Sequence, residues 1–112
     1  MKIGFTAKGI EWDSQIDPRF GRTDYILVFD EENKNLTSID NTDIANEAHG
    51  AGPQTAKKLA DLGVEVLITG NGPGGNAKTV VDKIGLTVFI GAEGKTVKEA
   101  YNAYKNNELE KF

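Results

Sequence analysis

The sequence predicts a single three-layer α/β domain, in which helices flank a mixed five-stranded sheet. Its 112 residues match the usual size of one domain with one core. The first forty residues hold three strand-like runs, two of them separated only by a short polar turn. The rest of the chain alternates helical patterns with short apolar runs, an order typical of parallel strands joined by right-handed crossovers.

Three strands, two of them in a hairpin, account for the first part of the chain. Residues 2–7 (KIGFTA) form a short apolar run, and a long irregular segment, 8–22, follows it. The β-branched and aromatic run 24–30 (DYILVFD) indicates a buried strand. After the polar turn 31–35, the alternating run 36–40 (LTSID) returns beside it, so these two strands form a β-hairpin.

A loop rich in Asn and Gly, 41–52, leads into the first predicted helix. Pro53 suits the first helical position, where its missing N–H is not needed, and Gly63 supplies the stop. The apolar stripe between them falls at i, i+3 and i+4: Ala56, Leu59 and Ala60. Residues 64–69 (VEVLIT) form the fourth strand.

Two more helices and one more strand complete the order. The second helix is predicted by an apolar stripe closed by Gly85: Ala77, Val80, Val81 and Ile84. Residues 86–91 (LTVFIG) form the fifth strand. Thr96 and Glu99 have the spacing of a capping box at the start of a third amphipathic helix. Its apolar positions are Val97, Ala100, Tyr101 and Tyr104. The polar tail 105–112 (KNNELEKF) is expected to fray.

This order of elements brings several loops to one edge of the sheet. With the first strand central, the strand order is 3-2-1-4-5 and only the second strand is reversed. The carboxyl ends of the other four strands then share an edge with three helix N-termini and with segments 7–22, 41–52, 70–76 and 91–95. Ligands of open α/β sheets bind at such edges, and helix N-termini favour anions. The sequence therefore predicts an anion site there.

Composition excludes several kinds of function. The chain has no Cys and a single His, which rules out thiolate chemistry and argues against a tightly held simple metal ion. A net charge of −4 argues against broad nucleic-acid binding. No apolar run approaches the roughly 20 residues of a membrane span, and the N-terminus lacks a long apolar signal region. We expect a cytoplasmic protein that binds neither membranes nor nucleic acid.

The glycine-rich stretch 68–80 (ITGNGPGGNAKTV) allows two interpretations. It lacks the spacing of a P-loop, and the dinucleotide fingerprint fails because Asn71, Pro73 and Asn76 break its register. It is therefore either a tight strand-to-helix turn or one wall of a cradle in which backbone N–H groups approach an anion. The other loops expected at the same edge favour the cradle.

Three stretches resemble the dinitrogenase iron–molybdenum cofactor biosynthesis family, in the same order and over nearly the whole chain: DPRFGRTDYILVFD (17–30), GAGPQTAKKLADLGVEVLITGNGPGGNA (50–77) and GKTVKEAYNAYKNNEL (94–109). The resemblance implies a ribonuclease-H-like fold. It also implies binding or transfer of the iron–molybdenum cofactor or its iron–sulfur precursor. The family includes small stand-alone members of unsettled role, to which this chain is similar.

Eight residues on three loops are the candidate ligand-binding residues: Arg19, Arg22, Gly50, Gly52, Asn71, Gly72, Gly74 and Asn76. Guanidinium planes suit anionic oxygen or sulfide faces, and His49 would supply one imidazole to a metal cluster. Structural interpretations stand beside these. Asp17 would pair with one arginine, His49 would be a solvated loop side chain, and Asn76 would be the N-cap of its helix. Trp12 either closes over a pocket or packs the loop.

We interpret the chain as a non-enzymatic module that holds an anionic ligand, an iron–sulfur or iron–molybdenum cluster, for storage or transfer. A cofactor-donor or acceptor protein would be its partner. A nuclease is excluded because neither the first nor the fourth strand ends in an acid that would hold divalent metal ions. The alternative is a small enzyme or regulatory domain that binds a phosphorylated metabolite at the same edge.

Overall fold

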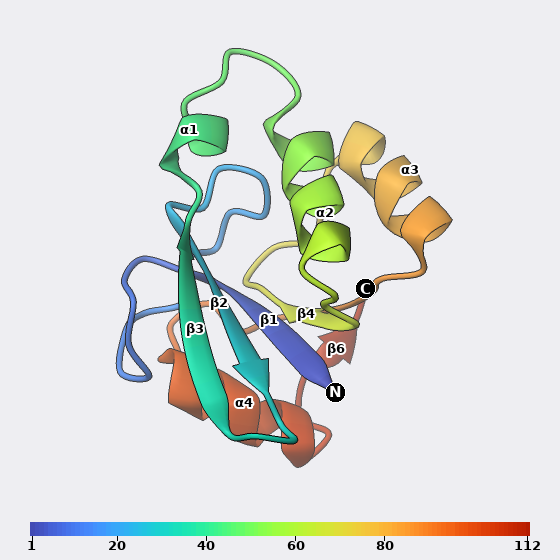
Figure 1. Cartoon of the computed structure of the whole chain (residues 1–112). Helices are drawn as coiled ribbons and strands as arrows, with labels where there is room; N and C mark the ends of the chain where they lie inside the picture. Colours follow the sequence, from blue (N-terminus) through green and yellow to red (C-terminus); the bar gives the residue numbers. More distant parts are fainter.

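A six-stranded sheet lies between two helical layers in the computed structural model, which describes residues 1–112 (Figure 1). The strands are β1 (Lys2–Ala7), β2 (Tyr25–Asp30), β3 (Asn35–Asp40), β4 (Val66–Ile68), β5 (Thr87–Ile90) and β6 (Glu110–Lys111). Their order across the sheet is β3-β2-β1-β4-β5-β6. β1 pairs with β4 and β4 with β5 in parallel, whereas β2 runs antiparallel to β1 and β3. The predicted α/β class and the order of the first five strands are confirmed.

The helices are α1 (Thr42–Ala45), α2 (Ala51–Asp61), α3 (Gly75–Ile84) and α4 (Val97–Lys105). α2 and α3 lie side by side on one face of the sheet, and α4 covers the other face (Figure 1). α1 is a single turn within the segment 41–52, which was predicted to be a loop throughout.

The core consists of two clusters, one on each face of the sheet. β2 supplies both because successive side chains of a strand point to opposite faces. Leu27 and Phe29 pack on the α4 side, whereas Ile26 and Val28 pack on the α2–α3 side. Burying a side chain of this kind contributes about 1.5–3 kcal/mol. A run that is apolar at nearly every position is therefore stable only as an inner strand, covered on both faces.

Local signals mark most helix ends correctly. The capping box of α4 is confirmed, since Thr96 Oγ1 accepts from Glu99 N at 3.1 Å and Glu99 Oε1 accepts from Thr96 N at 2.8 Å. Gly63 and Gly85 adopt the left-handed conformation, with φ of 76° and 72°, just after α2 and at the end of α3. The predicted start of α2 at Pro53 is wrong, because the helix begins at Ala51. Pro53 is tolerated there because the first four N–H groups of a helix have no intrahelical partner.

The prediction that the tail 105–112 frays is wrong. Glu110 and Lys111 pair with β5 as the antiparallel strand β6, and Phe112 N donates to Val88 O at 2.8 Å. Leu109 packs against the core on the α4 side. The free edge of β5 explains the difference, because it offers unpaired backbone groups that a short polar segment can satisfy.

Candidate functional site

Three segments far apart in the chain meet at the carboxyl edge of the parallel strands and line a cleft of about 380 Å³. The lining residues are Phe20, Gly21, Arg22, Gly50, Ala51, Gly52, Pro53, Gly72, Gly74, Gly75, Asn76 and Ala77. They come from the loop between β1 and β2, the start of α2, and the loop that opens α3. The predicted convergence of segments 7–22, 41–52 and 70–76 is confirmed.

Two glycines let these segments touch backbone to backbone. A Cβ atom on Gly21 would lie 2.6 Å from both Cα and N of Gly52. A Cβ atom on Gly52 would lie 2.8 Å from the Cβ atom of Ala77 in α3. Neither glycine has a positive φ, so space rather than backbone conformation requires them. Gly21 was not among the candidate residues, although its position directly before Arg22 could have indicated it.

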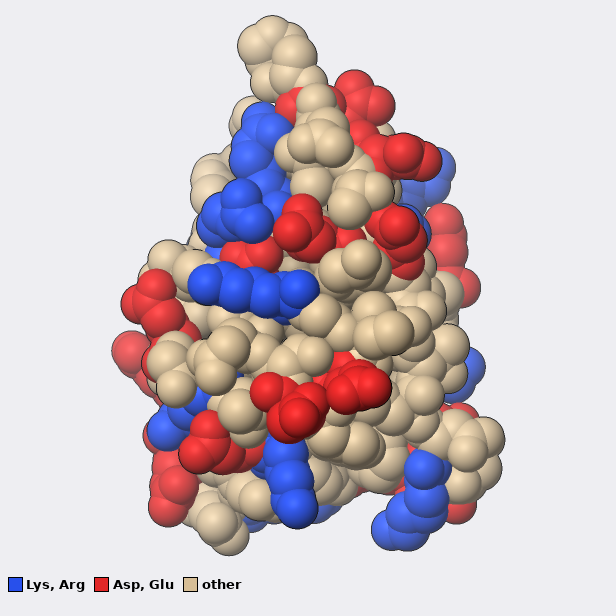
Figure 2. All heavy atoms as spheres, turned by 90° about the vertical axis from the view of Figure 1, so that its left-hand side faces the viewer, with Lys and Arg blue, Asp and Glu red and all other residues tan.

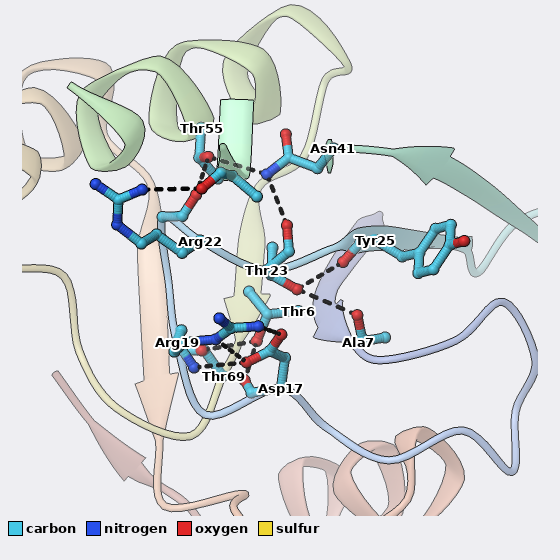
Figure 3. Close-up of polar contacts among 12 residues, drawn as sticks. Thr6, Ala7, Asp17, Arg19, Arg22, Thr23, Tyr25, Asn41, Thr55 and Thr69 are labelled. Atoms are coloured by element: carbon cyan, nitrogen blue, oxygen red, sulfur yellow. Dashed lines mark hydrogen bonds and ion pairs between the residues drawn. The ribbon is translucent and has the colours of Figure 1, made fainter. Parts of the chain in front are cut away.

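A buried polar network fixes the Gly21 side of the cleft (Figure 3). Thr55 Oγ1 of α2 donates to Gly21 O at 3.0 Å and accepts from Asn41 Nδ2 at 3.2 Å. Asn41 Nδ2 also donates to Thr23 O at 3.1 Å. Thr55, Asn41 and Thr23 are fully buried, and leaving such groups without partners would cost about 1–3 kcal/mol each. Thr55 was not among the candidate residues, although a polar side chain beside the apolar stripe of its helix could have indicated it.

A second network anchors the preceding part of the same loop and engages Arg19 (Figure 3). Thr6 Oγ1 donates to Asp17 O at 2.7 Å, and the fully buried Asp17 carboxylate accepts from Arg19 Nε at 3.0 Å and Nη2 at 2.9 Å. Burial alone would raise the pKa of Asp17, but the hydrogen bonds and charge of Arg19 outweigh it and lower this pKa. The interpretation of Asp17 as an arginine partner is confirmed, and Arg19 does not line the cleft.

Arg22 lines the cleft and also holds the segment that follows α1. Its Nη1 donates to Ala45 O and Glu47 O, both at 2.8 Å, and Nη2 approaches Ala48 O at 3.5 Å. All three acceptors are neutral carbonyl groups, and Arg22 forms no ion pair with a carboxylate. Its positive charge is therefore not paired with a carboxylate at the cleft.

Three other candidates differ in their relation to the cleft. His49 is exposed on the segment next to Gly50 and does not line the cleft. Asn71 is exposed and lies outside the lining, and its backbone N–H donates to Pro18 O at 2.8 Å. Asn76 lines the cleft, but its predicted role as N-cap is wrong. Gly74, with extended backbone at φ −70° and ψ 177°, is the N-cap of α3 and places Asn76 inside the helix.

The starts of α2 and α3 supply the cleft with free hydrogen-bond donors. Their N-cap residues are Gly50 and Gly74, so neither helix has a side-chain cap. In the first turns of these two helices, five backbone N–H groups that line the cleft donate to no oxygen of the chain: those of Ala51, Gly52, Gly75, Asn76 and Ala77. Each helix N-terminus also carries a partial positive charge equivalent to roughly half an elementary charge. These groups can bind an anion.

The cleft lining contains no carboxylate and no imidazole, so it offers neither a general acid–base pair nor the usual ligands of a bare metal ion. Nowhere in the chain do three His, Cys, Asp or Glu side chains come together as a metal-ion site. An anion that brings its own ligands, such as a cluster with inorganic sulfide, suits these donors better than a simple cation does.

Charges elsewhere on the surface are mixed. Figure 2 shows basic and acidic side chains interspersed on the side of the molecule that carries β3. This side therefore has no continuous basic surface of the kind that nucleic-acid phosphates require. None of the helices combines the length and the apolar character that crossing a lipid bilayer demands.

Comparison with known proteins gives consistent matches over most or nearly all of the chain. The family model described as dinitrogenase iron–molybdenum cofactor matches residues 1–107. An uncharacterised protein of Methanocaldococcus jannaschii is 32% identical over 104 residues, which span 89% of this chain and 85% of that protein. The apo form of the orange protein from Desulfovibrio gigas has a TM-score of 0.93 at 32% identity, covering 99% of this chain and 92% of that chain. A putative NifB protein from Thermotoga has a TM-score of 0.84 at 34% identity, covering 98% and 91%.

Proposed function

The chain belongs to the dinitrogenase iron–molybdenum cofactor family, and from this premise we propose that it binds an anionic metal–sulfur cluster for storage or transfer. The observation that carries the proposal is the cleft of glycines and free N–H groups at the starts of α2 and α3, beside the Arg22 guanidinium, which no carboxylate pairs with. The cluster is the cargo of this module, and no catalytic step is assigned to the chain.

The lining residues divide into three roles. Gly50, Gly52, Gly72 and Gly74 let the cluster approach the backbone, so that N–H groups donate to its sulfide or oxygen atoms. Arg22 supplies a full positive charge and a planar set of donors. Asn76 adds an amide that lines the same cleft.

His49 has a separate role in the proposal. It precedes Gly50, on the segment whose carbonyl groups Arg22 holds in place. His49 itself lies outside the lining, and the proposal is that from this adjacent position its exposed imidazole supplies one nitrogen ligand to a metal of the bound cluster. The proposal does not depend on Arg19 or Asn71, which do not line the cleft.

Storage or transfer requires a second protein that loads or receives the cluster, so a cofactor-donor or acceptor protein belongs to the proposal. The descriptions of two relatives support a role in holding a ligand related to cofactor assembly. The orange protein is described in an apo form, a term used for proteins that also have a ligand-bound form. The Thermotoga relative is described as a putative NifB protein.

The same donors would recognise the phosphate of a small metabolite, because helix N-termini bind phosphate and anionic clusters through the same N–H groups. We therefore keep binding of a phosphorylated metabolite, by a small enzyme or regulatory domain, as the second candidate. The lack of a carboxylate or imidazole in the lining favours binding over catalysis.

Anaerobic titration with isolated iron–molybdenum cofactor tests the proposal. Arg22→Ala should weaken binding by about 1.5–3 kcal/mol, or roughly one to two decades in Kd, because it removes a charge-assisted contact. Arg22→Lys should fall between this variant and the wild type. His49→Ala should change the absorption spectrum of the bound cofactor as well as its affinity. Lys98→Ala is the matched control, since it removes one exposed positive charge from α4, on the opposite face of the sheet.

Equal and salt-insensitive binding by the wild type, the Arg22 variants and His49→Ala would move the site away from this cleft. A wild type that binds inorganic phosphate but not the isolated cofactor would favour the metabolite candidate.

A further inference from the structure

The C-terminal segment crosses from the edge of the sheet to the loop that forms one wall of the cleft. Leu109 anchors it in the core on the α4 side, and the pairing of β6 with β5 carries it along the sheet edge. The hydrogen bond from Phe112 N to Val88 O, at 2.8 Å, continues this pairing by one residue. These backbone hydrogen bonds fix the position of Phe112 next to the loop.

The Phe112 ring lies where a side chain of Gly72 would be. A Cβ atom on Gly72 would overlap the Cε1 and Cδ1 atoms of this ring and would lie 3.0 Å from Cζ. With Lys78 and Val81 of α3, Phe112 also lines a hollow of about 280 Å³ between α3 and the sheet edge. The ring therefore lies against the loop at Gly72 and borders this hollow beside α3.

After its first residue the loop is held by packing, through Gly72 and the buried Pro73, and not by backbone N–H groups. Asn71 N is held by Pro18 O, but the N–H groups of Gly72 and Gly74 donate to no oxygen of the chain. A Cβ atom on Gly74 or on Gly75 would meet nothing within 4 Å. Gly72 is therefore the point where the Phe112 ring supports the loop, and the same residue lines the ligand cleft.

We propose that Phe112 is a positioning residue for the cleft. Its ring supports Gly72, and through Gly72 it holds the wall 72–75 and the free N–H groups at the start of α3 in the arrangement that the ligand meets. The effect on affinity rests on the proposed function, whereas the effect on the loop itself does not. Because preorganised donors bind more tightly than mobile ones, loss of this contact weakens binding without removing any group that touches the ligand.

Backbone ¹⁵N order parameters test the positioning role without any ligand. In Phe112→Ala, those of Gly72, Gly74 and Gly75 should fall from about 0.85, typical of rigid backbone, towards the values below about 0.6 of flexible segments. Phe112→Leu keeps an apolar side chain at this position and should stay near the wild type. Ile10→Ala is the matched control, because it truncates another exposed apolar side chain, 54% accessible, on the loop beside Trp12. Unchanged order parameters in Phe112→Ala would overturn the inference.

A double-mutant cycle gives a second test, with isolated iron–molybdenum cofactor as the probe. Phe112→Ala and Gly72→Ala should each weaken binding about three- to tenfold, since each separates the ring from the loop. The double variant should be no weaker than Phe112→Ala alone, because the ring that the new methyl group would displace is gone. Additive losses would refute the contact. A wild type that binds no cofactor would refute the proposed function, and the order parameters would still decide the positioning role.

Discussion

Replacement of Gly21 by alanine should disturb the closest backbone contact in the cleft. The new Cβ atom would lie 2.6 Å from Gly52 N and Cα and 2.9 Å from the carbonyl carbon of Ala51. Carbon atoms in contact are normally about 3.5–4.0 Å apart, so the overlap is close to 1 Å. All three neighbours are backbone atoms of a helix start, and Thr55 holds Gly21 from the same helix, so neither side yields easily.

The expected loss of stability follows from this overlap. Adding a methyl group to a tightly packed site typically costs about 1–3 kcal/mol. In a domain of this size each kcal/mol lowers Tm by about 4 °C, so Gly21→Ala should lower it by about 4–12 °C. The backbone conformation of Gly21 suits alanine, since its φ is not positive, and the whole effect is therefore one of space.

Urea unfolding measures the free-energy change, provided that the m-value stays the same. Gly75→Ala is the matched control, because its Cβ atom would meet nothing within 4 Å. This variant should be neutral or more stable by about 0.4–1 kcal/mol, since alanine restricts the unfolded chain. A Gly21→Ala protein as stable as the wild type would refute the close contact between the loop and α2.

Three further predictions concern the groups that hold the cleft and the last helix. Thr55→Val should lower the free energy of unfolding by about 1–3 kcal/mol, because it leaves one N–H of the Asn41 amide and the Gly21 carbonyl without a partner, and Thr55→Ser should lower it much less in the same urea assay. The lowered pKa of Asp17 implies stability that is present above its unfolded value, near 3.8, and is lost as pH falls through the folded value. Unfolding curves of Asp17→Asn across an acid pH series should accordingly converge with those of the wild type at low pH, and parallel curves would contradict this. Thr96→Ala should lower stability by about 1 kcal/mol in thermal unfolding through loss of the capping box, and an unchanged Tm would contradict it.

The fold was largely predictable because its main strands carry their own apolar pattern. β2 is apolar at four successive positions, which is typical of an inner strand. β6 consists of Glu110 and Lys111, and two charged residues form no pattern. β6 forms because the edge of β5 is free to pair with it. A free strand edge is a property of the assembled sheet, so the local sequence cannot predict it. For Ile84, by contrast, the sequence pattern predicts more burial than the structure has. This residue continues the apolar stripe of α3, yet its side chain is 39% exposed.

The location of the cleft was also predictable, because parallel strands bring their carboxyl ends to one edge. The partners of individual side chains were not. Arg19 and Arg22 look equivalent in the sequence, but Arg19 is held by the buried Asp17 two residues away, whereas Arg22 reaches carbonyl groups 23 to 26 residues further along. Spacing in the sequence carries no signal for such long-range hydrogen bonds to the backbone.

If the cleft holds an anion, as proposed above, the side-by-side arrangement of α2 and α3 links its occupancy to the lifetime of the protein. Both helices begin at the cleft, so the positive ends of their dipoles lie together and repel each other in the free chain. An anion between them removes this repulsion and, by mass action, stabilises the folded state by about 2.7 kcal/mol at a hundred times its Kd. The empty protein then unfolds more often than the filled one and is more readily degraded by proteases. On the proposed function, the amount of this protein in a cell would therefore respond to the supply of its ligand.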